Sequence, residues 1–331
     1  MSGVHRVYGA EVSPYSIKVR SYFRYKHIPH EWIVRDQSRM EEFQQYAKLP
    51  LIPLVVTPDD AGIQDSTPII ELLEAEFPKP TIHSPDPVIA FLSALIEEFG
   101  DEWGNKWMFH YRWAREIDQV SAATRIARSM MPELDDEQIV GVADSIRQRM
   151  LGRVGFVGSS EQTAPQIEDS FQEGIGQLEA HLATRPYLFG ARPSFGDFGL
   201  WGQIYNAWTD PTAGALLNEN TPHVVSWTKR MLEPSDEGGF EAWDTLSSTL
   251  TPFLSRQVGR LFLPWSDANA KAIAAGKGEF SIDLDGHSWT QKPQKYHARS
   301  LAALRARYQA VGGNAALDEI LESTGCLDWL V

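Results

Sequence analysis

Four consecutive residues near the start of the chain, Ser13-Pro14-Tyr15-Ser16, have the spacing of a thiol redox motif but contain no thiol. With cysteines at both ends they would read Cys-Pro-Tyr-Cys, in which a helix N-terminus stabilises a reactive thiolate. Serine instead offers a hydroxyl, which donates and accepts hydrogen bonds. On its own, the motif indicates that Ser13 is the N-cap of a helix.

The segments around this motif alternate between strand and helix patterns. The expected elements are a strand at 5–8, a helix at 16–27, strands at 30–34, 51–56 and 63–64, and a helix at 67–77. Pro78 and Pro80 end the last helix, because proline cannot continue one. This order of β-α-β followed by β-β-α predicts a thioredoxin-like α/β domain over residues 1–80, although periodicity alone does not separate it from other small α/β units.

After a linker at 79–87, helical periodicity dominates residues 88–232 and predicts an all-α domain. Ser194 and Asp197 within it have the spacing of a capping box, in which each side chain bonds the backbone N–H of the other. This pattern on its own indicates only where a helix begins.

Residues 233–331 form a C-terminal extension of mixed structure, expected to pack on the helical domain. Helical patterns return at 243–260 and 300–309. Between them, residues 279–289 alternate apolar and polar side chains around Asp285-Gly286, which predicts a β-hairpin. No motif in the extension assigns it a role.

Three segments of the first domain, in this order, carry a resemblance to a known family. They are Tyr8 to Arg20 with the Ser-Pro-Tyr-Ser motif, Leu51-Ile52-Pro53-Leu54, and Asp65-Ser66-Thr67-Pro68-Ile69-Ile70. Together with Pro-Ser-Phe-Gly-Asp at 193–197, they resemble the glutathione S-transferase superfamily over residues 4–232. The resemblance implies a thioredoxin-like domain followed by a helical domain, glutathione as co-substrate, and a homodimer.

The resemblance also implies that Ser13 donates a hydrogen bond to the sulfur of glutathione, so that the thiolate belongs to the bound tripeptide. A free thiol of pKa ~8.5 is about 3% ionised at pH 7, and a drop of about two units makes it about three-quarters ionised. A charge-assisted hydrogen bond and a helix N-terminus supply energies of that order. Tyr8, Tyr15 and Ser16 are competing catalytic hydroxyls, Tyr8 because other branches of the family use a tyrosine in the first strand.

Five further residues match positions that the family uses to bind glutathione. Ile52 and Pro53 match a cis-proline dipeptide whose exposed backbone pairs with the peptide backbone of glutathione. Asp65 and Ser66 match an acid–serine pair that takes the γ-glutamyl amine and carboxylate, and Lys48 is placed to reach the glycyl carboxylate. The alternatives are an ordinary trans-proline at a strand edge and a plain helix N-cap.

The helix expected around residues 97–115 is rich in aromatic side chains. Trp103, Trp107, His110 and Tyr111 fall on one face, and the family places this helix beside the glutathione thiol. We therefore expect these four residues in the second-substrate pocket. The competing interpretation is that they belong to the core, with His110 as an interior histidine.

Composition limits the partners and the compartment. The 331 residues carry 30 Lys and Arg against 44 Asp and Glu, a net charge of −14, which disfavours nucleic acid and anionic membranes as partners. We expect no transmembrane helix and no secretory signal. The single cysteine, Cys326, fits a reducing compartment, and a cytoplasmic location is expected. The nine histidines show no metal-ligand spacing, so no metal is expected.

The function that best fits these observations is a glutathione transferase-like enzyme that directs the glutathione thiolate at a small electrophile. Serine at position 13 disfavours the thiol-transfer chemistry of the family's cysteine-type branch. Two alternatives stay open: a non-catalytic binding or assembly protein of this fold, and an enzyme of this fold that does not use glutathione.

Overall fold

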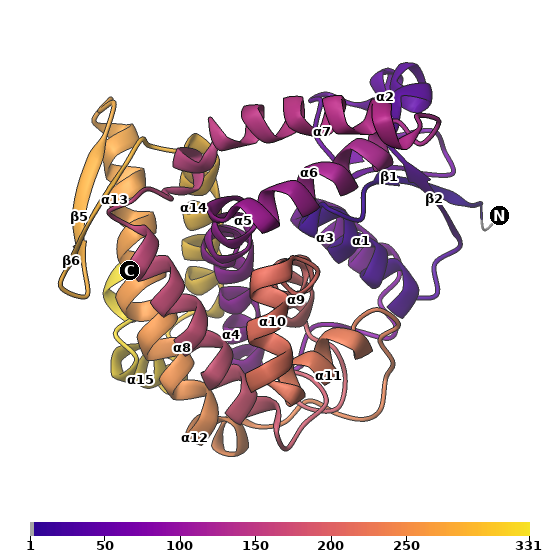
Figure 1. Ribbon diagram of the computed structural model, residues 1–331. Helices are drawn as coiled ribbons and strands as arrows, with labels where there is room; N and C mark the ends of the chain where they lie inside the picture. Colours follow the sequence, from indigo (N-terminus) through magenta and orange to yellow (C-terminus); the bar gives the residue numbers. More distant parts are fainter. Residues whose placement is uncertain (1–2) are drawn as a thin grey trace.

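The computed structural model describes residues 3–331 and begins with a four-stranded mixed sheet (Figure 1). The strands are β1 (His5–Gly9), β2 (His30–Val34), β3 (Leu54–Val56) and β4 (Gly62–Gln64), in the spatial order β2-β1-β3-β4. β1 pairs in parallel with β2 and antiparallel with β3, which pairs antiparallel with β4. The strand expected at 51–56 is shorter than predicted, because Pro53 precedes it and cannot donate to a ladder.

Three helices cover the two faces of this sheet: α1 (Pro14–Tyr25), α2 (Met40–Tyr46) and α3 (Ser66–Glu76). Alternate side chains of the strands point to opposite faces. Val7 and Val55 therefore pack in the main core with α1 and α3, whereas Tyr8 and Leu54 pack with Phe43 of α2. The result is the predicted thioredoxin-like domain. Sequence analysis did not predict α2.

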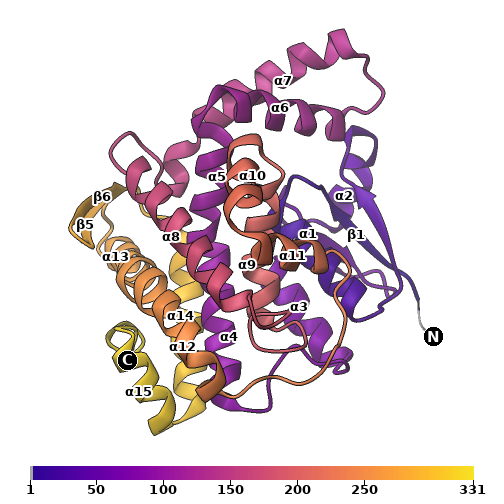
Figure 2. The same ribbon diagram turned by 60° about the horizontal axis from the view of Figure 1, so that its bottom comes forward.

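The helical region follows α3. Its helices are α4 (Pro87–Phe99), α5 (Asn105–Ala114), α6 (Glu116–Met130), α7 (Asp136–Leu151), α8 (Ala164–Leu182), α9 (Phe195–Trp208), α10 (Pro211–Asn220) and α11 (Pro222–Arg230). A π-helical turn at Gly100–Gly104 joins α4 to α5. α9 lies at the centre and contacts α1, α4, α5 and α10 (Figure 2). The predicted capping box is present at its start, where Ser194 and Asp197 bond each other's backbone N–H.

Glycines on α9 allow neighbouring helices to approach closely. A Cβ at Gly199 would lie 2.8 Å from the backbone of Glu97 in α4, and one at Gly202 would lie 2.6 Å from the carbonyl oxygen of Pro14 in α1. Any larger residue would push these backbones apart. Gly202 therefore helps to place the start of α1, where the Ser-Pro-Tyr-Ser motif lies.

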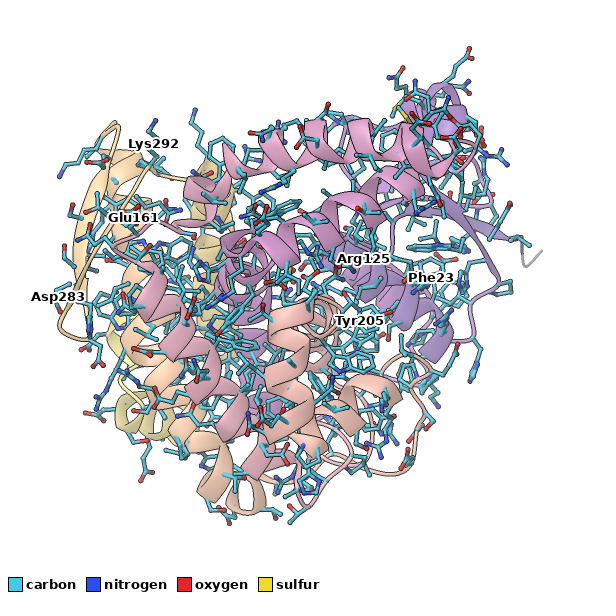
Figure 3. All side chains as sticks on the ribbon, viewed as in Figure 1. Phe23, Arg125, Glu161, Tyr205, Asp283 and Lys292 are labelled. Atoms are coloured by element: carbon cyan, nitrogen blue, oxygen red, sulfur yellow. The ribbon has the colours of Figure 1, made fainter. Side chains whose placement is uncertain are left out.

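The C-terminal extension contains four helices and a hairpin. They are α12 (Trp243–Phe253), α13 (Leu263–Ala274), β5 (Phe280–Leu284), β6 (His287–Gln291), α14 (Lys295–Val311) and α15 (Ala315–Ser323), with a π-helical segment at Leu254–Phe262. The β-hairpin predicted for residues 279–289 is present. Asp285 (φ 54°) and Gly286 (φ 82°) form its turn. Asp283 lies in its first strand and Lys292 just beyond its second (Figure 3).

The extension packs on the helical region, with α14 against both α4 and α13. Side chains fill the spaces between these helices (Figure 3). α14 begins at Lys295 rather than at the predicted Ser300. The difference matters because the additional turn carries Tyr296 and His297, which lie beside the first domain.

Candidate functional site

Ser13 is the N-cap of α1. Its backbone is extended, with φ −107° and ψ 112°, and Pro14 occupies the first helical position. The Ser13 Oγ accepts hydrogen bonds from the Ser16 backbone N–H at 3.3 Å and from the Ser16 Oγ at 3.0 Å. No described residue accepts the proton of the Ser13 hydroxyl. Ser13 is therefore both a cap and a hydroxyl with a proton to donate.

The other candidate hydroxyls are engaged or lie elsewhere. Ser16 is fully buried and donates to Ser13. Tyr15 donates to the Asp101 carbonyl oxygen at 2.9 Å. Tyr8 is fully buried on the α2 side of the sheet, with its ring 6.0 Å from that of Phe43. Burial raises the pKa of both tyrosines above their ordinary value, so both stay protonated near neutral pH.

The Ile52–Pro53 peptide bond is cis, as the resemblance implied. A side chain that sequence analysis missed, Gln64, holds the loop before it. The Gln64 amide oxygen accepts from the backbone N–H of Lys48 and Leu49, and its amide nitrogen donates to the carbonyl oxygens of Leu49 and Leu51. Its position directly before Asp65-Ser66, at the end of β4, was the available signal. Gln64 thereby fixes the loop beside Ile52.

Asp65 and Ser66 begin α3, as predicted, with Ser66 as the first helical residue. Asp65 has φ 82°, a left-handed conformation that is uncommon for a residue with a side chain. The Asp65 Oδ2 accepts a hydrogen bond of 2.6 Å from the hydroxyl of Tyr296 in α14. The C-terminal extension thus reaches the first domain at one of the predicted binding residues.

A cavity of about 300 Å³ lies where these elements meet. From the first domain it is lined by Tyr15, Leu49, Leu51, Ile52, Pro53, Gln64, Asp65 and Ser66. Glu102 of the π-helical turn and Asn105 of α5 also line it, as do Tyr296 and His297 of α14. The structure thus brings together four predicted binding residues in one cavity. Lys48 is exposed and does not line it, although its neighbour Leu49 does.

A second cavity of about 280 Å³ adjoins the first, since both are lined by Tyr15 and Asn105. Its remaining lining is mostly apolar: Val12, Pro14, Met108, Phe109, Arg112, Trp113, Ile126, Met150 and Val157. The walls come from the neighbours of Ser13 in the sequence, from α5, α6 and α7, and from the 3-10 turn at Val154–Val157, whereas Ser13 itself lines neither cavity. The two cavities meet at the N-terminus of α1, the end of the helix that carries partial positive charge.

The four residues predicted for the second-substrate pocket, Trp103, Trp107, His110 and Tyr111, lie in the core instead. Trp103, Trp107 and Tyr111 are at most 1% exposed and His110 is 3% exposed, and none of them lines either cavity. Both indoles donate to the Ser170 Oγ of α8. Trp103 and Trp107 do lie on one face of the helix, as predicted, but this face packs against α8. The residues of α5 that line the cavities are instead Asn105, Met108 and Phe109, together with Arg112 and Trp113.

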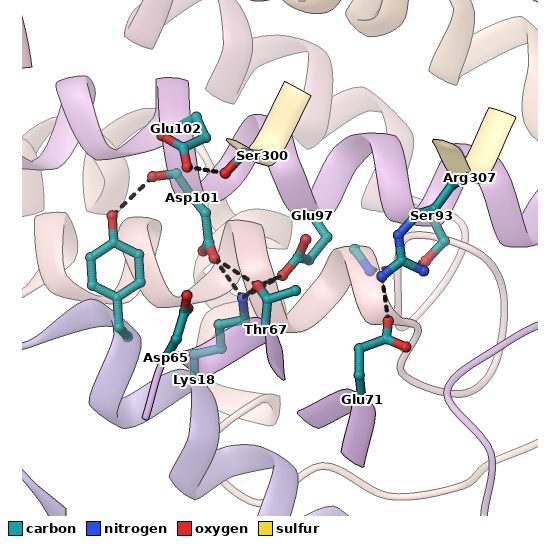
Figure 4. Close-up of polar contacts among 12 residues, drawn as sticks. Lys18, Asp65, Thr67, Glu71, Ser93, Glu97, Asp101, Glu102, Ser300 and Arg307 are labelled. Atoms are coloured by element: carbon teal, nitrogen blue, oxygen red, sulfur yellow. Dashed lines mark hydrogen bonds and ion pairs between the residues drawn. The ribbon is translucent and has the colours of Figure 1, made fainter. Parts of the chain in front are cut away.

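Residues of α1, α3, α4 and the π-helical turn form a buried ion cluster (Figure 4). Lys18 of α1 donates to Glu97 at 2.5 Å, to Asp101 at 2.7 Å and to Thr67 at 3.2 Å. Burial raises the pKa of the Asp101 carboxyl to about 7, against the opposing effect of Lys18. The cluster connects α1 and α3 of the first domain to α4 and the π-helical turn of the helical region. It therefore fixes the position of the two regions that line the first cavity.

Comparison with known proteins assigns the family. The sequence profile for the glutathione S-transferase N-terminal domain matches residues 7–81, and the profile for the glutathione S-transferase C-terminal domain matches residues 161–230. Residues 7–81 and 161–230 of the chain thus correspond to the two domains of the glutathione S-transferase superfamily. No curated protein matches the chain.

Similar solved structures include the beta-etherase LigF from Sphingobium sp. strain SYK-6, with 19% identity and a TM-score of 0.47, covering 69% of this chain and 94% of that one. A Tau class glutathione S-transferase from mango, Mangifera indica, has 16% identity and a TM-score of 0.41. The match covers 76% of this chain and 98% of the mango protein. A glutathione S-transferase from Methylobacterium radiotolerans, in complex with glutathione sulfonate, has 16% identity and a TM-score of 0.37, covering 72% and 96%.

Two further observations concern residues 3–331. No helix in this range is long and apolar enough to cross a membrane. No group of three or more His, Cys, Asp or Glu side chains in the same range is arranged to hold a metal ion.

Proposed function

We propose that the chain is a glutathione-dependent transferase that binds glutathione in the first cavity and a small electrophile in the second. One observation carries this proposal: two adjoining cavities, one lined by four of the five predicted glutathione-binding residues and one mostly apolar, meet at the N-terminus of α1. Ser13 caps that helix, and its hydroxyl proton has no acceptor among the described residues.

The binding roles follow from the lining of the first cavity. The Ile52 main chain pairs with the peptide backbone of glutathione. Ser66, at the N-terminus of α3, receives the γ-glutamyl carboxylate, and Asp65 receives the γ-glutamyl amine. Lys48 attracts the glycyl carboxylate from the rim. These contacts place the cysteinyl sulfur toward Tyr15 and Asn105, where the two cavities adjoin.

The chemistry begins with loss of the thiol proton to solvent. The Ser13 hydroxyl donates a hydrogen bond to the resulting thiolate, and the N-terminus of α1 stabilises its charge. An electron pair of the sulfur then forms a bond to an electrophilic carbon. In a displacement the leaving group departs with the bonding pair, and in an addition the displaced π electrons take up a proton from solvent. The enzyme contributes a lower thiol pKa and a fixed orientation of both reactants.

The test is glutathione binding by calorimetry, combined with an absorbance titration of the bound thiolate. The natural chain is expected to bind glutathione and to lower its thiol pKa by about two units. Ser13→Ala is expected to bind but to lose most of that shift. Ser145→Ala serves as the matched control, because Ser145 is exposed on α7 and bonds only the Gly141 carbonyl oxygen.

Each result leads to a different conclusion. Absence of binding at millimolar glutathione would overturn the proposal. Binding without any change in the thiol pKa would favour the non-catalytic alternative. An unchanged pKa shift in Ser13→Ala would move the thiol-contacting role to another group.

A homodimer and a cytoplasmic location remain predictions. α14 packs against α4, and Arg307 of α14 pairs with Glu71 of α3 at 2.8 Å, so these faces are covered within one chain. A second copy must therefore use other surfaces. Light scattering after size-exclusion chromatography measures the oligomeric state directly.

A further inference from the structure

The first turn of α14 forms part of the first cavity, although it lies outside both segments that match the family. Tyr296 and His297 line the cavity together with Ile52 and Ser66. The matched segments end at residue 230, so this wall belongs to the C-terminal extension. The family resemblance therefore gave no information about these residues.

The contact between Tyr296 and Asp65 has the form of a positioning interaction. The Tyr296 hydroxyl donates to the Asp65 Oδ2 at 2.6 Å, within the range of charge-assisted bonds between oxygens. The Asp65 Oδ1 makes no hydrogen bond with any described residue, so it is free for a cationic group. Asp65 also has the left-handed φ of 82°, which a surrounding structure must hold in place. Tyr296 supplies part of that support.

Several contacts hold the first turn of α14 against the cavity. Ser300 donates to Glu102 at 2.8 Å, and the His297 Nδ1 contacts the other Glu102 oxygen. Just before the helix, Asn269 of α13 bonds both the N–H and the carbonyl oxygen of Gln294, at 2.7 and 3.0 Å. Figure 4 shows the Glu102–Ser300 bond and the Arg307–Glu71 pair further along the helix. Tyr296 is therefore presented to Asp65 by an anchored helix.

We propose that Tyr296 is a ligand-positioning residue of the glutathione site, acting through Asp65. Its hydroxyl orients the carboxylate so that the Oδ1 faces the primary amine of the γ-glutamyl group. The C-terminal extension thereby selects ligands that carry a cationic amine at that end. This inference rests on the proposed function, because it concerns the same cavity and the same ligand.

The test compares two probes on three proteins. The probes are glutathione and its desamino analogue, in which the γ-glutamyl amine is replaced by hydrogen. The proteins are the natural chain, Tyr296→Phe and Tyr308→Phe. Tyr308 is a matched control, since it lies on the same helix and donates to the Asp318 carboxylate at 2.7 Å without lining the cavity. Phenylalanine removes only the hydroxyl in both variants.

Tyr296→Phe is expected to weaken glutathione binding by about three- to tenfold and to leave binding of the desamino analogue unchanged. Tyr308→Phe is expected to change neither. Two results in Tyr296→Phe would overturn the inference: binding of both probes weakened equally, or no change in the binding of either. Tighter binding of glutathione would also overturn it, because Tyr296 would then compete with the amine for Asp65. If the natural chain binds neither probe, the proposed function itself fails, and this inference fails with it.

Discussion

Tyr15 donates a hydrogen bond of 2.9 Å to the main-chain carbonyl oxygen of Asp101. This bond joins the first turn of α1 to the π-helical turn before α5, and it places the Tyr15 ring between the two cavities. The hydroxyl of Tyr15 is thereby engaged, whereas the proton of Ser13 is not. The relationship separates two residues that the sequence alone leaves as rivals for the contact with the thiol.

We therefore predict that Tyr15→Phe leaves the pKa of the bound glutathione thiol nearly unchanged, while Ser13→Ala raises it by about one to two units. The measurement is the thiolate absorbance as a function of pH at saturating glutathione. A rise in the thiol pKa in Tyr15→Phe as large as in Ser13→Ala would assign the thiol contact to Tyr15.

Gly202→Ala is predicted to disturb the site from a distance. The added Cβ would lie 2.6 Å from the Pro14 carbonyl oxygen, so α1 and α9 must separate. Overpacking of this kind costs about 1–3 kcal/mol of the free energy of unfolding, and it displaces the N-terminus that should stabilise the thiolate. Denaturant unfolding and the thiolate titration measure the two effects.

The control for that variant is Gly176→Ala, because a Cβ at Gly176 in α8 meets nothing within 4 Å. Alanine is the better helix former there, so this variant should be more stable by about 0.5–1 kcal/mol. If Gly202→Ala were equally well tolerated, the close approach of α1 to α9 would have no role in placing the motif.

Asp197→Ala is predicted to lower the free energy of unfolding by about 3–5 kcal/mol. Its carboxylate is fully buried and accepts from the backbone N–H groups of Leu188 and Ser194, the Ser194 hydroxyl and the Trp227 indole. Removing it leaves four donors without their partner. Denaturant unfolding measures the loss.

The capping box at the start of α7 provides the comparison. Asp135 and Gln138 bond each other's backbone N–H, but both bonds are exposed to water. Asp135→Ala should therefore cost only about 1 kcal/mol. Similar losses at the two sites would show that burial does not set the energy of the Asp197 network.

A pH effect on stability is predicted from His181. Burial lowers the pKa of His181 to about 4, and the nearby Arg185 guanidinium acts in the same direction. Both nitrogens of the neutral ring have hydrogen-bond partners. The Nε2–H donates to the Leu188 carbonyl oxygen at 2.8 Å, and Nδ1 lies 2.7 Å from the Thr249 hydroxyl. Glu241 pairs with Arg185 on the same side.

The unfolded chain has a histidine pKa near 6.5, so it binds more protons than the folded chain between about pH 6.5 and pH 4. The free energy of unfolding therefore falls as the pH drops through this window, by about 3 kcal/mol from His181. Comparing natural chain and His181→Gln at pH 7 and pH 4.5 isolates this contribution, because the glutamine does not titrate. An equal pH dependence of the two proteins would contradict the prediction.

Features that depend on local chemistry could be predicted from the residues alone. Four of them follow from a few adjacent residues and their backbone preferences: the Ser13 N-cap, the Ser194–Asp197 capping box, the Asp285-Gly286 hairpin, and the start of α3, predicted at Thr67 and found at Ser66. The resemblance added the cis bond at Pro53. The fold brings four predicted binding residues, Ile52, Pro53, Asp65 and Ser66, into one cavity.

Which faces of the helices meet the cavities could not be predicted in this way, because it depends on how elements distant in the sequence pack together. The spacing of Trp103 and Trp107 predicted a shared face, and both do bond Ser170, but α8 covers that face. The contact of Tyr296 with Asp65 joins residues 231 positions apart. Periodicity reports that a helix has an apolar face, but what covers that face depends on how distant elements pack.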